Sequence, residues 1–304
     1  MQIKERLPEW FRVQIHSGES YARLSRMLSE RGLNTVCQGA RCPNIWECWN
    51  HGTATLMILG ESCTRNCRFC GVPHDSSPQF PDPDEPEQAA GAVESLGLDW
   101  AVITSVTRDD LPDGGAEHFA MTVRAIHNRL PRCGVEILIP DLHGNRAALE
   151  TVSNCGAQVI AHNVETVPRL YPAARPQADY TLSLRVLREL AGMSEGRYTV
   201  KSSRILGLGE TEEELLAVFV DLRTSGCTAL TLGQYLPPGR NHLPVKRYWT
   251  PEEFDMLAGK AREAGIERVA SGPKVRSSYH SHELAGRSLR SRGDGTPPSG
   301  GPAT

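Results

Sequence analysis

Residues 37–70, CQGARCPNIWECWNHGTATLMILGESCTRNCRFC, contain six of the nine cysteines of the chain. These cysteines form two groups of three, with the spacings C-x4-C-x5-C and C-x3-C-x2-C. A short apolar run between the groups, residues 54–59, ends at Gly60 and predicts a first β-strand. The two groups are Cys37, Cys42 and Cys48, and then Cys63, Cys67 and Cys70.

Three cysteines at short intervals are typical of a loop that wraps a compact iron–sulfur cluster through its thiolates. Each group leaves one iron of a four-iron cluster for another ligand, either a distant side chain or a small molecule. Zinc sites favour C-x2-C pairs joined to a second pair or to histidines, and only Cys67 and Cys70 form such a pair. Disulfides belong to oxidising compartments, to which nothing in the sequence directs the chain. The spacing therefore favours two clusters.

Beyond this stretch, helical and strand-like segments alternate along the chain, which implies parallel strands with right-handed crossovers. About six strand–helix units are too few for a closed eight-stranded barrel, so we expect an α/β fold with a partial (β/α)6 barrel of the TIM type. A doubly wound open sheet is an alternative that this pattern does not exclude. The expected helices span 86–97, 115–129, 145–154, 181–192, 211–225 and 251–264, and the strands 100–106, 134–139, 157–162, 198–204, 227–233 and 267–270.

Apolar spacing predicts a further helix over 20–30, in the lead-in to the first cysteine group. Two of the expected helices also carry clear signals at their starts. Thr211 with Glu214, and Thr250 with Glu253, place a capping hydroxyl and an acidic residue where the first backbone N–H groups of a helix need acceptors.

Composition narrows the class of protein. A net charge of −3 and a pI of about 6.4 give no electrostatic case for nucleic acid or an anionic membrane as partner. No apolar run approaches the ~20 residues of a membrane helix, and MQIKERLPEW lacks the apolar stretch of a secretory signal. We therefore expect a cytoplasmic protein. Residues 286–304 are rich in Gly, Pro and Ser, and we expect them to be a disordered tail.

Several residues follow or end the predicted strands, where the ligands of barrel enzymes bind. Gly114 and Gly115 come after strand 100–106, and paired glycines let the backbone approach a ligand closely. Asn163 and Glu165 follow strand 157–162, and Lys201 lies in strand 198–204. A plain turn at the glycines, and satisfied rim residues at the other positions, are the alternatives.

The second cysteine group, CTRNCRFC at 63–70, resembles the signature of the radical S-adenosylmethionine enzymes, including the aromatic Phe69 before the last cysteine. In combination with the first cysteine group and with RSSY at 276–279, the sequence is similar to the lipoyl synthase family. The similarity covers roughly residues 5–283.

The resemblance implies roles for these residues. Cys63, Cys67 and Cys70 would hold a 4Fe–4S cluster whose open iron is chelated by S-adenosylmethionine. The glycine pair would bind the amino group of that molecule, and the segments HNVETV and VKSSRILGLGE would line its pocket. Cys37, Cys42, Cys48 and a serine of RSSY, for which we choose Ser278 over Ser277, would hold an auxiliary 4Fe–4S cluster.

The resemblance also implies the reaction and its participants. The activity would be insertion of sulfur at C6 and C8 of a protein-bound octanoyl-lysine through a 5′-deoxyadenosyl radical, with the auxiliary cluster consumed as the sulfur source. Partners would be octanoylated lipoyl carrier domains (2-oxoacid dehydrogenase E2 subunits and the glycine cleavage H protein). An electron donor such as ferredoxin or flavodoxin and an iron–sulfur carrier protein would also be needed. We expect neither nucleic acid nor a membrane as a partner.

The expected organisation has four parts: an N-terminal extension with the first cysteine group (1–53), the barrel (54–270), a segment with the serine ligand (271–285), and the tail (286–304). Two other functional classes stay open at this stage. A different radical enzyme with an auxiliary cluster would be inactive on octanoylated carrier protein. A non-catalytic iron–sulfur carrier or sensor would not cleave S-adenosylmethionine.

Overall fold

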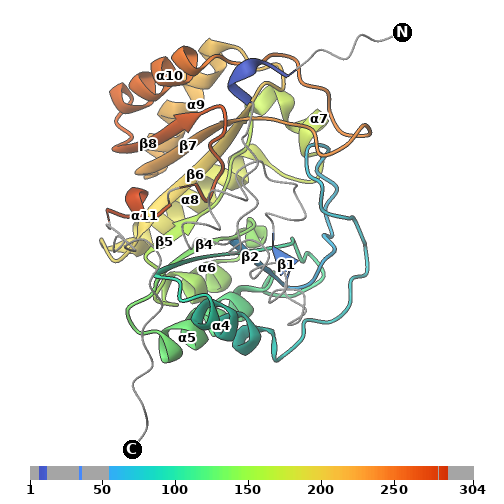
Figure 1. The fold of residues 1–304 in the computed structure, drawn as a ribbon, viewed down its shortest axis with the longest axis vertical. Helices are drawn as coiled ribbons and strands as arrows, with labels where there is room; N and C mark the ends of the chain where they lie inside the picture. The colour runs from blue at the N-terminus through green and yellow to red at the C-terminus, as the bar shows by residue number, and fades with distance from the viewer. Residues whose placement is uncertain (1–6, 12–33, 36–54, 280, 287–304) are drawn as a thin grey trace, which may run out of the picture.

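A single curved sheet organises the structure, a computed structural model that describes residues 7–11, 34–35, 55–279 and 281–286 (Figure 1). The strands of the described residues lie side by side in chain order from β1 to β8. The pairing of β1 with β2 is antiparallel, and every later pairing is parallel. The first cysteine group and the helix predicted over 20–30 lie outside the described residues.

The strands are β1 (Asn34–Thr35), β2 (Thr55–Ile58), β3 (Trp100–Ser105), β4 (Gly134–Leu138), β5 (Val159–Ala161), β6 (Thr199–Leu206), β7 (Ala229–Gln234) and β8 (Arg268–Gly272). The α-helices are α4 (Glu85–Ser95), α5 (Ala116–Arg129), α6 (Arg146–Ser153), α7 (Tyr171–Ala174), α8 (Tyr180–Ser194), α9 (Glu212–Thr224), α10 (Pro251–Glu263) and α11 (Ser281–Leu284). Short 3-10 turns occupy Glu9–Phe11 (η1), Leu142–Gly144 (η2) and Pro168–Leu170 (η3).

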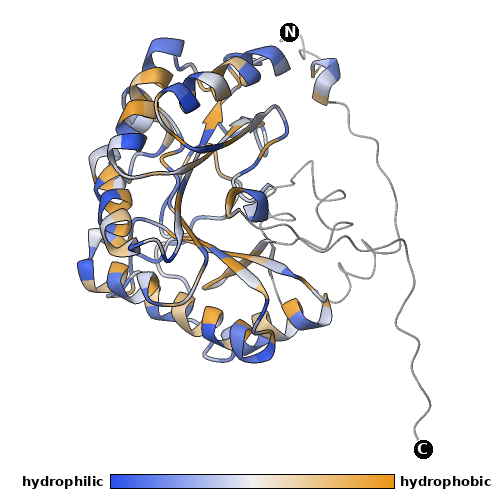
Figure 2. Ribbon diagram, turned by 90° about the vertical axis from the view of Figure 1, so that its left-hand side faces the viewer, coloured by the Kyte–Doolittle hydropathy of each residue, from blue (hydrophilic) through white to orange (hydrophobic). Residues whose placement is uncertain are grey.

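The crossover helices all lie on the convex side of the sheet, which leaves an open concave side (Figure 2). A doubly wound sheet would instead place helices on both faces and reverse its strand order. The prediction of a partial (β/α)6 barrel is therefore confirmed. The predicted helices and strands of this part are present with boundaries that differ by one or two residues, and α7, α11 and the short β1 were not predicted.

The apolar core lies between the sheet and these helices. Alternate strand residues such as Ile103, Ile137 and Leu230 enter it, together with helix residues such as Phe119 and Phe219. Residues in between, such as Glu136 on β4, face the concave side instead. Each strand therefore supplies an apolar face for stability and a second face that is free to carry chemistry.

Both predicted capping boxes are present. Thr211 at the start of α9 and Thr250 at the start of α10 each accept a hydrogen bond from the backbone N–H three residues on. Glu214 and Glu253 return the interaction to the backbone of the capping residue. These local signals could be recognised in the sequence because they depend only on neighbours within one turn.

In the described residues, no helix is both long and apolar enough to cross a membrane.

Candidate active site

The second cysteine group forms a loop directly beyond the carboxyl end of β2. The Cys63 amide donates to the Pro73 carbonyl at 2.8 Å, and the Cys70 amide donates to the Cys67 carbonyl at 3.0 Å. The three thiols are free and partly exposed. A position beyond the end of a parallel strand is where barrel enzymes carry their catalytic groups, as the sequence predicted.

N–H groups lie around the sulfurs of this loop. The Cys63 sulfur accepts from the Arg65 amide at 3.4 Å and from the Thr107 amide at 3.3 Å. The Arg175 side chain favours the ionised form of Cys67, and the Val72 amide favours that of Cys70. Because N–H groups stabilise sulfur that carries negative charge, this donor set fits thiolates that hold a cluster.

Burial opposes ionisation of these thiols when they are free. It raises the pKa of Cys67, and it raises the pKa of Cys70 to about 11, with the neighbouring thiols adding to both effects. Thiolates are the form that binds metal, so cluster binding must release protons and supply positive charge at this loop.

Arg65 fixes the cysteine loop to two neighbouring strand ends. Its guanidinium donates to both carboxylate oxygens of Asp109, beyond β3, at 2.8 Å each. It also donates to both oxygens of Asp141, beyond β4, with the Nη2 contact at 2.8 Å. The Arg65 side chain is only 7% exposed and that of Asp141 only 1%. Although burial opposes it, the hydrogen bond from Arg65 lowers the pKa of Asp141 to about 2.

The predicted glycine pair lies beside this loop. Gly115 has a φ of +91° and forms the N-terminal cap of α5. A β-carbon there would collide with the Leu59 side chain, which follows β2. Gly114, with a φ of +62°, backs onto Leu142 beyond β4. Only glycine fits so close a meeting of three strand ends.

Asn163 and Glu165, predicted from the end of β5, are joined to the cysteine loop through Arg175. The Asn163 amide donates to Glu165 at 2.9 Å, and Arg175 donates to the Asn163 carbonyl at 3.0 Å while its charge acts on Cys67. Burial raises the pKa of Glu165, and the charge of Arg175 opposes that shift. Asn163 Oδ1 is buried and has no hydrogen-bond partner among the described residues, so it is available to a bound donor.

Lys201 is placed differently from the expectation. It lies in the first half of β6, which continues to Leu206, and it points toward the concave face. Its ammonium donates to both oxygens of Glu136 at 2.7 and 2.9 Å, and both side chains are 1% exposed. The ammonium is therefore committed to a buried ion pair. Ser277 and Ser278 lie in a partly buried turn after β8.

The sequence did not reveal four residues of the site, which are Arg65, Asp109, Asp141 and Arg175. No motif spacing marks them, since Arg65 is 44 and 76 positions from its two partners. A further contact joins the loop after β7 to the cysteine loop, where the His242 ring lies 3.0 Å from the Cys70 carbonyl.

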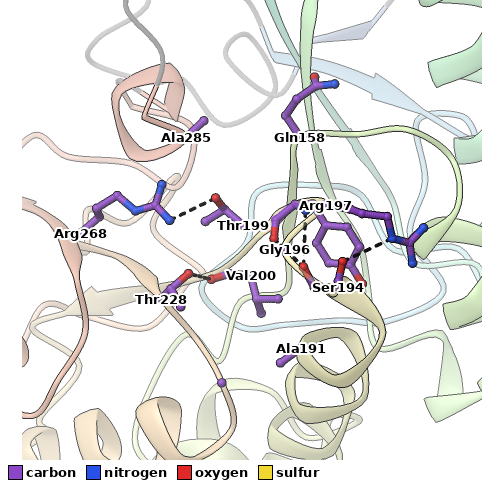
Figure 3. A pocket seen from close by; sticks show the side chains of 12 residues that line it. Gln158, Ala191, Ser194, Gly196, Arg197, Thr199, Val200, Thr228, Arg268 and Ala285 are labelled. Atoms are coloured by element: carbon purple, nitrogen blue, oxygen red, sulfur yellow. Dashed lines mark hydrogen bonds between the residues drawn. The ribbon is translucent and has the colours of Figure 1, made fainter.

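A separate cavity of about 440 Å³ opens at the other end of the barrel (Figure 3). Its lining includes Gln158 and Thr199, which lie at the amino ends of β5 and β6, and Arg268, which donates to Thr199 at 3.2 Å. The cysteine loop lies beyond the carboxyl end of a strand, so this cavity belongs to the opposite end of the molecule.

Comparison with known proteins assigns the class. The family model of the radical SAM superfamily matches residues 57–222, which include the cysteine loop and the strands around it. The solved FeFe-hydrogenase maturase HydG from Carboxydothermus hydrogenoformans matches with a TM-score of 0.56 at 12% identity, over 86% of this chain and 74% of that chain. At this identity the likeness concerns the fold alone. The fold and the cysteine loop define a radical S-adenosylmethionine enzyme.

Closer relatives narrow the assignment. The lipoyl synthase of Pelodictyon phaeoclathratiforme is 50% identical over 280 residues, which cover 91% of this chain and 94% of the relative. The lipoyl synthase of Methylococcus capsulatus is 53% identical over 281 residues, covering 92% and 87%. A model of the N-terminal domain of lipoyl synthase matches residues 1–42. The chain belongs to the lipoyl synthase family.

We predict that Arg65→Lys lowers the iron content after anaerobic reconstitution by roughly half, because an ammonium cannot bridge two carboxylates as a planar guanidinium does. Iron and sulfide are counted per chain, and far-UV circular dichroism checks the fold. Arg124→Lys is the matched control, since Arg124 pairs with Glu117 at the surface. An unchanged iron content in Arg65→Lys would show that the bridge does not organise the cysteine loop.

His162 supplies a pH prediction. Its ring is 1% exposed and lies 3.1 Å from the Ile139 carbonyl, and burial lowers its pKa to about 4. The unfolded chain binds a proton near pH 6.5, whereas the folded chain does not until about pH 4, so stability falls as the pH falls through this window. We expect His162 to reduce the free energy of unfolding by about 2 kcal/mol between about pH 7 and about pH 5.

Urea unfolding at the two pH values measures this effect. His162→Asn should remove this part of the pH dependence, whereas His143→Asn, at a half-exposed ring, should not. Equal pH dependence in wild type and His162→Asn would contradict the assignment.

Proposed function

We propose that this chain inserts two sulfur atoms, at C6 and C8, into an octanoyl chain carried on a lysine of a lipoyl carrier protein. The observation that carries the proposal is the Cys63–Cys70 loop beyond β2, with two backbone N–H groups directed at the Cys63 sulfur, in a chain of the lipoyl synthase family. The bound cofactors supply reductive cleavage of S-adenosylmethionine, hydrogen abstraction from the octanoyl chain, and sulfide from the auxiliary 4Fe–4S cluster.

The residues around the loop bind and orient the cosubstrate in this proposal. Cys63, Cys67 and Cys70 would hold the first cluster, and the iron that they leave open would bind S-adenosylmethionine. The amino group is assigned to the Gly114–Gly115 turn, which meets Leu59 between β2 and the cysteine loop. Asn163 and Glu165 line the pocket, and the unpartnered Asn163 Oδ1 is an acceptor for a hydroxyl or amine there.

Lys201 acts on this pocket indirectly in the proposal, because its ammonium is paired with Glu136. It supports β6, whose carboxyl end continues into the segment RILGLGE at 204–210. Two hydrogen bonds join the segment after β5 to β6. The Val164 amide donates to Ser202 Oγ, and the Glu165 amide donates to the Ser203 carbonyl.

The second cluster is assigned to Cys37, Cys42, Cys48 and Ser278. A serine oxygen is a harder ligand than a thiolate, so Ser278 would hold iron less firmly than the three cysteines would. The four-part organisation follows from this assignment: an N-terminal extension (1–53) and a C-terminal segment (271–285) meet the barrel (54–270), followed by the tail (286–304).

The proposed setting follows from the chemistry. The substrates are lipoyl carrier proteins, for which we propose octanoylated 2-oxoacid dehydrogenase E2 subunits and the glycine cleavage H protein. A low-potential donor such as ferredoxin or flavodoxin supplies electrons, and an iron–sulfur carrier protein rebuilds the second cluster. Thiolate clusters persist in a reducing compartment, so we place the chain in the cytoplasm.

An anaerobic assay tests the function. The reconstituted chain is incubated with dithionite, S-adenosylmethionine and an octanoyl-lysyl peptide, and the peptide is followed by mass spectrometry. We expect 5′-deoxyadenosine and a peptide with two added sulfurs. Release of 5′-deoxyadenosine with an unchanged peptide would overturn the substrate assignment, and no release would overturn the radical chemistry.

Ser278 carries a prediction of its own. Ser278→Ala should reduce sulfur insertion by about 100-fold or more, since loss of even an outer-shell partner costs 10–100-fold at metal sites. Cleavage of S-adenosylmethionine should persist, because the first cluster keeps its ligands. Ser277→Ala is the adjacent control, and the reverse pattern, with Ser277→Ala inactive, would transfer the ligand role to Ser277.

A further inference from the structure

The segment after β8 turns back into the barrel and crosses its concave face. Gly233 on β7 faces this side, and a β-carbon there would collide with the Val275 carbonyl. Further along, Ser281 at the start of α11 accepts a hydrogen bond from Trp100, the first residue of β3. The chain thus passes from the carboxyl end of the strands to their amino end, and α11 lies inside the arc of the sheet (Figures 1 and 2).

A buried polar network holds α11 in that position. Trp100 Nε1 donates to Ser281 Oγ at 2.6 Å. Because the indole N–H can only donate, the Ser281 hydroxyl acts as acceptor and its own proton is free for another partner. The Glu136 carboxylate is near enough for Ser281 to oppose the rise that burial causes in its pKa, and this carboxylate also receives the Lys201 ammonium. Each of the four side chains therefore has its partner inside the barrel.

Burial makes this network a strong constraint. All four residues are buried, with at most 1% of their surface exposed. Removal of one partner would leave a buried polar group or charge without compensation, which is far more costly than loss of a surface contact. Ala285, which directly follows α11, adds an apolar contact with the cluster of Trp100, Val102 and Val159.

Ala285, which directly follows α11, also reaches the cavity at the amino end of the barrel. It lines that cavity together with Thr199 and packs on the concave face (Figure 3). The network that holds α11 therefore also fixes one wall of this cavity.

We propose that Ser281 is a positioning residue, which docks the C-terminal segment in the barrel without help from any cluster and so presents Ser278 as a ligand. The claim that Ser281 presents Ser278 rests on the proposed ligand role of Ser278. Ser278 lies between Val275, which meets Gly233, and Ser281, which meets Trp100. A cluster consumed in each turnover would then be rebuilt against a serine that is already in place.

Hydrogen exchange of the iron-free full chain tests the docking. The amides of Tyr279, Ala285 and Gly286 are hydrogen-bonded within the segment, so they report its local order. We expect slow exchange over residues 275–286 in wild type and at least about 10-fold faster exchange in Ser281→Ala and in Trp100→Phe. The double variant should exchange no faster than the single variants, since both changes remove the same hydrogen bond between Trp100 and Ser281. Ser183→Ala, at a buried hydroxyl of α8, is the matched control.

Spectroscopy of the reconstituted protein tests the presentation. Ser281→Ala should lose the Mössbauer signal of one cluster and keep the other, with 5′-deoxyadenosine release retained. Fast exchange in iron-free wild type, or unchanged exchange in Ser281→Ala, would overturn the docking. Faster exchange with both cluster signals intact would overturn the claim that Ser281 positions Ser278. If Ser278 is not a ligand at all, Ser278→Ala will keep both cluster signals while the segment stays protected from exchange.

Discussion

The bridge between Arg65 and two carboxylates is the constraint on which the site depends. Asp109 and Asp141 follow neighbouring strands, and Arg65 sits between Cys63 and Cys67, so one guanidinium fixes the cysteine loop relative to β3 and β4. A buried charge is tolerated because two carboxylates compensate it, and loss of one partner of such a group costs roughly 3–5 kcal/mol. The backbone is also held tightly there, with positive φ at Leu59 and Leu142 beyond β2 and β4.

The two ends of the concave face are organised in the same manner. At the carboxyl ends of the strands, Arg65 and Arg175 tie loops together around the three sulfurs. At the amino ends, Trp100 donates to the Ser281 hydroxyl at the start of α11, beside the buried pair of Glu136 and Lys201. The convex face supplies the apolar core and hence most of the stability. Polar groups on the concave face instead determine where the cysteine loop and α11 lie.

Local signals in the sequence predicted a large part of this arrangement. The alternation of apolar strands and amphipathic helices predicted the partial barrel, and Thr211 and Thr250 marked helix starts through contacts within one turn. The Arg65 and Trp100 contacts could not be predicted, because they span 44 to 181 positions and depend on which strand ends adjoin. Lys201 illustrates the limit: its strand was predicted, but its pairing with Glu136 across β5 depends on the register of three strands.

Mössbauer spectroscopy of the full chain reconstituted with 57Fe, before and after addition of S-adenosylmethionine, tests the central claim most directly. The account predicts two 4Fe–4S clusters, of which one acquires a distinct iron site when S-adenosylmethionine binds at the Cys63–Cys70 loop. A single cluster, or two clusters that S-adenosylmethionine leaves unchanged, would contradict it.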